Sequence, residues 1–134
     1  MLKTYHGSCH CQRVRFSAQL DLASGTGKCN CSFCGKARFW GKMTQPAALQ
    51  LLAGEEELSR YQFASHSVEH LFCRHCGMRP FSRGDVAEIG GPFVSINLAC
   101  LDDLDPAELL AAPVTYFDGL HDNWQETPAE TRHL

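Results

Sequence analysis

Cysteine spacing is the feature that most constrains this chain. Seven of the eight cysteines fall into three closely spaced groups, and the eighth stands alone. Gaps of one or two residues let neighbouring sulfurs converge on one metal ion. A reducing compartment disfavours a structural disulfide framework, so the pattern favours metal binding over disulfides. The groups are Cys9 with Cys11, then Cys29, Cys31 and Cys34, then Cys73 with Cys76, and the lone residue is Cys100.

A redox role is a second interpretation of one of these groups. The segment "CRHC" at residues 73–76 resembles the redox pair of thioredoxin-type proteins, which normally opens a helix. Here Gly77 and Pro80 follow the second cysteine, and this composition disfavours a helix. Metal binding therefore remains the better interpretation of this pair.

The number of ligands suggests how the cysteines divide. Structural zinc takes four protein ligands, whereas catalytic zinc takes three and leaves a position for water or substrate. Each two-cysteine group is half a site, so we expect a closed zinc site of Cys9, Cys11, Cys73 and Cys76. The triplet Cys29, Cys31 and Cys34 then holds a second, open zinc. In the alternative, Cys100 or a nearby histidine completes the second site and both zincs are structural.

Apolar periodicity predicts a mainly β fold with one or two short helices. The segment 13–20 alternates with period two, as a half-buried strand does. Asp105, Pro106 and Pro113 predict one short helix at 105–112. A chain of 134 residues with 44% hydrophobic residues suits a single domain over residues 1–134. Further strands are expected at 37–43, 49–53, 60–63, 67–73 and 93–99.

Charge and hydropathy limit the partners. The net charge is −3, and residues 84–131 contain ten acidic residues and no lysine or arginine, so we expect no nucleic-acid partner. No stretch approaches the roughly 20 apolar residues that span a bilayer, and the N-terminus lacks the apolar run of a signal peptide. We therefore expect a cytoplasmic protein with no membrane partner. The sequence does not determine the oligomeric state.

Five motifs in order resemble one known family. They are "GSCHCQRVRF", "CNCSFCGK", "LFCRHCG", "INLACLDDLDP" and "YFDGLHDNW", and the match that contains them runs from about Tyr5 to Trp124. This set is similar to the glutathione-dependent formaldehyde-activating enzyme family, which also includes centromere protein V. The resemblance implies a zinc-stapled β-tent fold with the same two ligand sets. It also implies a zinc-dependent carbon-sulfur lyase that forms or cleaves S-hydroxymethylglutathione from glutathione and formaldehyde.

Residues around the triplet are candidates for binding the thiol substrate. Three thiolates on one zinc ion leave a net negative charge that opposes the carboxylates of glutathione, and cations could offset it. We expect Lys36 and Arg38 to contact the thiol and Trp40 to line its pocket, although an aromatic residue in a strand is often part of a core. Lys28 and Lys42 belong to the same basic cluster.

Several features are left open by the sequence. We expect the histidines at 66, 70 and 75 to lie near Cys73 and Cys76, as surface or supporting residues rather than metal ligands. The segment 118–124 either closes over the open site or packs the C-terminal tail. A non-catalytic zinc-binding module or a glutathione carrier is the alternative function.

Overall fold

A three-stranded antiparallel sheet forms one side of the molecule in the computed structural model, which describes residues 1–134. Its strands are β1 (Lys3–Ser8), β2 (Arg15–Leu20) and β5 (Leu49–Ala53), in the order β1-β2-β5. Phe16, Ala18 and Leu20 of β2 are buried, whereas Arg15 and Gln19 are exposed. The predicted alternation thus places one face of β2 in the core.

A second sheet of seven strands makes up most of the remaining fold. Its order is β10-β3-β4-β9-β8-β7-β6, and all neighbours are antiparallel except the parallel pair β10 and β3. The strands are β3 (Thr26–Cys29), β4 (Trp40–Thr44), β6 (Leu58–Tyr61), β7 (Val68–Cys73), β8 (Phe81–Val86), β9 (Gly91–Asn97) and β10 (Val114–Phe117).

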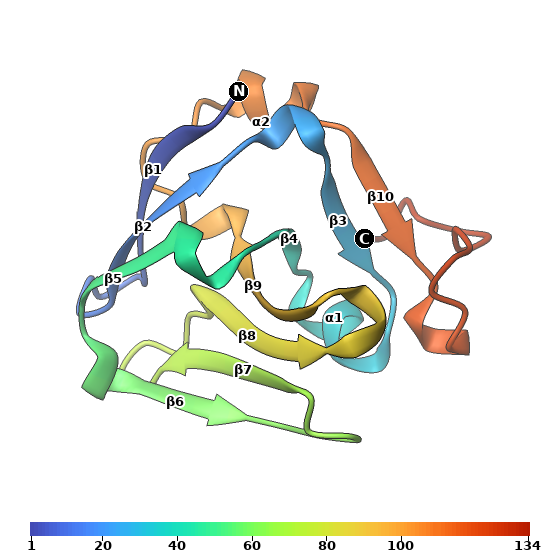
Figure 1. The fold of residues 1–134 in the computed structure, drawn as a ribbon, viewed down its shortest axis with the longest axis horizontal. Helices are drawn as coiled ribbons and strands as arrows, with labels where there is room; N and C mark the ends of the chain where they lie inside the picture. Colours follow the sequence, from blue (N-terminus) through green and yellow to red (C-terminus); the bar gives the residue numbers. More distant parts are fainter.

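The sheets enclose a triangular frame (Figure 1). One side is the three-stranded sheet, the opposite side is the β3–β10 pair, and β6, β7 and β8 form the base, while β4 and β9 run through the middle. The core lies where the sheets meet. There the ring of Phe16 packs edge-on against that of Phe81, with centroids 5.6 Å apart, and both side chains are fully buried.

The two helices are short. Helix α2 (Pro106–Ala111) begins after Asp105, whose Oδ1 accepts a hydrogen bond from the Ala107 N–H at 2.9 Å. Helix α1 (Ser32–Ala37) carries part of the cysteine triplet and was not predicted. No helix has the length and apolar character needed to cross a membrane.

The predicted fold class is confirmed: the protein is mainly β with two short helices. The predicted strand at 37–43 begins too early, because α1 continues to Ala37 and ends with Arg38 in the left-handed conformation. The predicted strand at 93–99 extends too far, because residues Leu98–Cys100 form a 3-10 turn. Strands β1, β3, β8 and β10 were not predicted.

Candidate metal centres

Four cysteines from two distant loops meet in one cluster. Cys9 and Cys11 follow β1, whereas Cys73 ends β7 and Cys76 lies in the turn after it. Their sulfurs all lie within 4.8 Å of one another, and Cys11 Sγ is 3.6 Å from the sulfurs of both Cys9 and Cys73. Sulfurs bound to one tetrahedral zinc at about 2.3 Å are separated by about 3.8 Å. The four residues therefore fit a single zinc ion.

The loops around this cluster are held by main-chain contacts. The Val14 N–H donates to Cys9 Sγ at 3.3 Å, and the Gly77 N–H donates to the Cys73 carbonyl at 2.8 Å. Gly77 has a φ of +78°, a backbone conformation that glycine adopts without steric cost. This conformation lets the chain turn directly after Cys76. His75 contacts the carboxylate of Glu57 instead of completing the cluster.

The remaining three clustered cysteines form a second group beside α1. Cys29 ends β3, Cys31 is the residue that caps α1, and Cys34 lies inside the helix. The Cys31 N–H donates to Cys29 Sγ and the Cys34 N–H donates to Cys31 Sγ, both at 3.3 Å. The three sulfurs lie within 4.8 Å of one another, and all three residues are half-buried. The start of α1 thus folds the triplet into a three-donor site.

No fourth histidine, cysteine or carboxylate joins this three-donor group. Cys100 is buried in the core, where its Sγ donates to the Arg79 carbonyl at 3.6 Å. The donor set therefore matches three protein ligands and one further position.

The three cysteines of the triplet differ in the direction in which their pKa values are shifted. Contacts with Cys29 and then Cys34 lower the pKa of Cys31 to about 2. Contact with Cys31 raises the pKa of Cys29, and contacts with Cys29 and then Cys31 raise that of Cys34. The raised pKa values of Cys29 and Cys34 favour their thiol forms. Binding of a divalent metal to all three sulfurs would therefore release protons.

The predicted thiol-binding residues have different surroundings. Lys36 and Arg38 are exposed on α1 and at its C-terminal end. Trp40 is half-buried, packs against the core and donates its Nε1–H to Thr26 Oγ1 at 2.9 Å. These contacts place Trp40 against the core, and its role in lining a thiol pocket stays a prediction.

The two other cations of the basic cluster are engaged elsewhere. Lys42 donates to Ser24 Oγ at 2.7 Å and to the Gly25 carbonyl at 2.6 Å. Lys28 lies 4.4 Å from the centroid of Trp40 and donates to the Leu134 carbonyl oxygen at 3.0 Å. Neither forms a hydrogen bond to a sulfur of the triplet.

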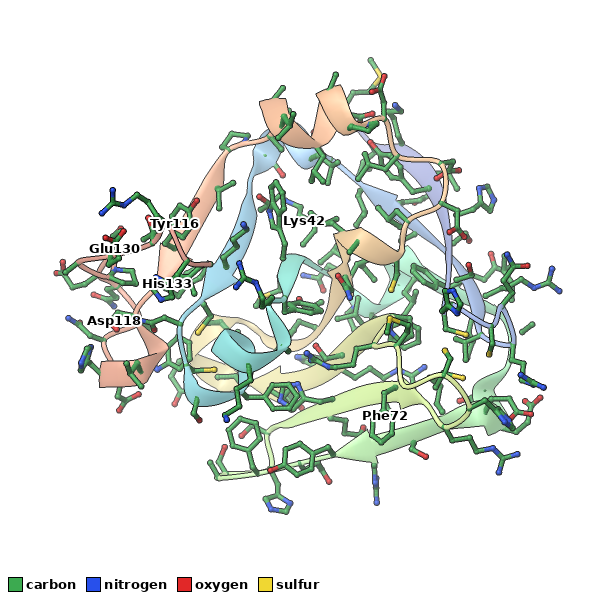
Figure 2. The ribbon with its side chains drawn as sticks, turned by 180° about the vertical axis from the view of Figure 1, so that it is seen from behind. Lys42, Phe72, Tyr116, Asp118, Glu130 and His133 are labelled. Atoms are coloured by element: carbon green, nitrogen blue, oxygen red, sulfur yellow. The ribbon has the colours of Figure 1, made fainter.

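The segment 118–124 packs against the three-cysteine cluster. Asn30 Nδ2 donates to Asp118 Oδ1 at 2.8 Å, and the Leu120 N–H donates to Asn30 Oδ1 at 2.9 Å. A Cβ added to Gly119 would lie 2.7 Å from Cys29 Sγ and 2.6 Å from the Trp124 ring, so a larger residue there would force one of them to move. Figure 2 shows Asp118 in this C-terminal segment, to the side of α1. This segment therefore covers the cluster on the Cys29 side.

Sequence reasoning missed two residues that adjoin the triplet. Phe33 lies between Cys31 and Cys34 in α1, and the guanidinium of Arg79 lies 4.4 Å from the centroid of its ring. Arg79 is 45 residues beyond Cys34 in the chain. No local pattern in the sequence indicates that the two segments meet.

The chain is similar to a known protein family and to a solved structure. A family model described as glutathione-dependent formaldehyde-activating enzyme matches residues 4–117. The chain is also similar to the crystal structure of a Rhodobacter sphaeroides protein, solved as a structural-genomics target. The two are 28% identical with a TM-score of 0.70, and the match covers 82% of this chain and 99% of that chain.

Proposed function

Because the chain belongs to the glutathione-dependent formaldehyde-activating enzyme family, as its five motifs indicated, we propose that it joins glutathione to formaldehyde at a zinc ion held by Cys29, Cys31 and Cys34. The observation that supports this proposal most directly is the division of seven cysteines into a four-donor cluster and a three-donor cluster. The first suits a structural zinc and the second leaves one position for a ligand. The product is S-hydroxymethylglutathione. The reverse reaction cleaves its carbon-sulfur bond, which is the reaction of a carbon-sulfur lyase.

The chemistry requires little from protein side chains. A divalent zinc ion, when bound, lowers the pKa of a coordinated thiol and so keeps it as a thiolate. The glutathione sulfur forms a bond to the carbonyl carbon of formaldehyde, the carbonyl π electrons move to its oxygen, and that oxygen takes a proton from water. No protein nucleophile is consumed, which agrees with a site built from metal ligands.

The chain positions the substrate and shields one side of it. Lys36 and Arg38 are exposed near Cys34 and can attract the carboxylates of glutathione. The close packing of Gly119 on Cys29 keeps water away from that side of the cluster. We propose that the substrate approaches from the side opposite residues 118–124.

One observation favours the alternative of a non-catalytic zinc module or glutathione carrier. Two hollows on the surface, of about 260 and 370 Å³, are lined by no cysteine. Neither of these two hollows therefore offers a substrate pocket at the three-cysteine cluster. A carrier would hold the thiol without accelerating its reaction.

Exchange spectroscopy separates these functions. Zinc-loaded protein is added to an equilibrium mixture of glutathione, formaldehyde and their adduct, and the rate of exchange is measured by nuclear magnetic resonance. We expect faster exchange with the wild-type protein and the uncatalysed rate with Cys34→Ser. Saturable glutathione binding with no acceleration would support the carrier, and neither binding nor acceleration would support the structural module.

A further inference from the structure

Arg79 is a half-buried cation that is held at both ends. Its main-chain carbonyl accepts hydrogen bonds from Asn97 Nδ2 at 2.8 Å and from Cys100 Sγ at 3.6 Å. Its guanidinium lies between two rings, 4.4 Å from the centroid of Phe33 and 4.9 Å from that of Phe39. These contacts hold the charged group in one position against the helix that carries the triplet.

This guanidinium has no carboxylate partner. Its Nη2 lies 3.0 Å from His70 Nδ1, which accepts the hydrogen bond. Its Nε and Nη1 are buried and have no hydrogen-bond partner, and no other buried side-chain nitrogen or oxygen in the chain is in this state. An unpaired buried charge is unfavourable unless another charge compensates it.

The nearby groups that can carry a negative charge are cysteine thiols, which are thiolates when they bind a metal ion. Burial lowers the pKa of Arg79, whereas the charges of Cys34 and Cys31 raise it. Two of the three triplet cysteines therefore act on this cation. By contrast, Lys36 and Arg38 are exposed, so water and salt weaken their effect on the same cluster.

We propose that Arg79 is the internal counter-cation of the three-cysteine cluster and makes its open position prefer anionic ligands, thiolates above all, to neutral ones. The proposal rests on the proposed function in taking these cysteines as metal ligands. Three thiolates on a divalent ion already leave a net negative charge, and an anionic fourth ligand adds another. A fixed cation beside the cluster offsets that repulsion, whereas a neutral ligand gains little from it.

Cobalt-loaded protein provides the test, because a thiolate bound to cobalt gives charge-transfer absorption that does not depend on turnover. The protein is titrated with glutathione, an anionic sulfur ligand, and with imidazole, a neutral nitrogen ligand. We expect Arg79→Met to weaken glutathione binding by about tenfold or more and imidazole binding by less than about twofold. Arg79→Lys should restore most of the preference.

Two controls separate charge from structure. Arg83→Met removes another arginine that lies over a phenyl ring, 5.4 Å from the centroid of Phe81, and should change neither affinity. Because Nε and Nη1 of Arg79 are buried, the effect of Arg79→Met should persist between about 0.05 and 0.5 M salt, whereas effects of exposed cations are screened over that range. If the methionine variant does not fold, Arg79→Gln removes the charge while keeping an amide donor for His70.

The outcomes distinguish this proposal from the proposed function. Equal weakening of glutathione and imidazole binding, or an unchanged preference for glutathione in the Arg79→Met and Arg79→Gln variants, would mean that Arg79 serves only in packing. The proposed open metal site would be unaffected by that result. Wild-type cobalt protein that binds neither ligand would overturn both proposals. Selective loss of glutathione binding, recovered by lysine, supports both.

Discussion

At the scale of single residues, the two cysteine clusters should respond differently to the loss of one sulfur. Cys76 belongs to the cluster that joins the loops after β1 and β7. Zinc binding to such a closed site contributes on the order of 10 kcal/mol to folding. We therefore expect Cys76→Ser to leave the protein largely unfolded or insoluble, as judged by circular dichroism and the melting temperature. A soluble variant with the wild-type melting temperature would contradict the four-ligand assignment.

The matched substitution in the other cluster should be much milder. Cys31 belongs to a site formed within residues 29–34, which joins no distant parts of the chain. Cys31→Ser should fold nearly normally and retain one zinc per chain, measured by metal analysis after dialysis. Its serine hydroxyl can still cap α1, so the helix start is kept. Unfolding as severe as that of Cys76→Ser would count against an open site.

Asp118 links the C-terminal segment to the three-cysteine cluster and should make its packing sensitive to acid. Its hydrogen bond from Asn30, and then its contact with His121, lower its pKa. A carboxyl with a lowered folded pKa stabilises the fold above its ordinary pKa of about 3.9, and that stability is lost as the pH falls through the folded pKa. The stability difference between wild type and Asp118→Asn should therefore be constant from about pH 7 to 5 and shrink towards pH 3.

Urea unfolding at a series of pH values measures this difference. Asp122→Asn, which changes an exposed carboxylate in the same segment, is the control. A stability difference that does not change with pH would show that the Asp118 charge contributes nothing and that only the shape of the side chain matters.

At the scale of elements, helix α2 depends on its capping residue. Asp105 Oδ1 accepts from the Ala107 N–H at 2.9 Å, and Pro106 occupies the first helical position. Replacing such a cap with alanine typically costs about 1 kcal/mol. We expect Asp105→Ala to lower the unfolding free energy by about that amount in urea titrations, while Asp105→Asn, which keeps the acceptor, changes it little. A larger loss in the asparagine variant would contradict the capping role.

The same comparison shows why one helix was predicted and the other was not. Helix α2 has a cap, a proline at its start and Pro113 beyond its end, all readable from adjacent residues. Helix α1 begins at Cys31 and contains Gly35, which is a poor helix former. Its first turn is stabilised by the Cys34 N–H donating to Cys31 Sγ. Cysteine spacing predicted the site, but the helix that makes the site was not visible in propensities.

Short strands near one edge of the seven-stranded sheet were missed for a related reason. Strand β3 reads "TGKC" and has no apolar alternation, so nothing local marks it as a strand. It is held by its two neighbours, the parallel β10 and the antiparallel β4. In contrast, "LQLLA" was predicted at 49–53 and is β5 with the same bounds. Local pattern predicts a strand only where one face of it is apolar.

At the scale of the whole molecule, the three-cysteine site combines residues that are close in sequence with residues that come from far along the chain. The cysteine clusters could be predicted because ligand spacing is a local property of the chain. The Arg79 guanidinium and Gly119 reach the triplet only through the fold, from positions far along the sequence. The sequence pointed instead to the nearby cations, of which Lys42 and Lys28 bind main-chain carbonyls elsewhere. Two of the four cations suggested by proximity in sequence are therefore engaged away from the triplet.

Metal removal should proceed in two steps because one cluster joins the two sheets and the other closes only a short loop. The four-cysteine cluster ties the loop after β1 of the three-stranded sheet to the end of β7 in the seven-stranded sheet. The triplet instead closes a loop of six residues between β3 and α1. Loss of the triplet's metal should therefore leave the two sheets joined, whereas loss of the other should separate them.

Titration of the zinc-loaded protein with a chelator, followed by a metal indicator and near-ultraviolet circular dichroism, tests this order. We expect the first zinc to leave with little change in the aromatic signal and the second to leave together with cooperative loss of that signal, since metal affinity and folding are coupled in a closed site. Cys31→Ser supplies the control: it should show only the second step. A first step that already abolishes the aromatic signal would mean that the triplet, rather than the four-cysteine cluster, holds the two sheets together.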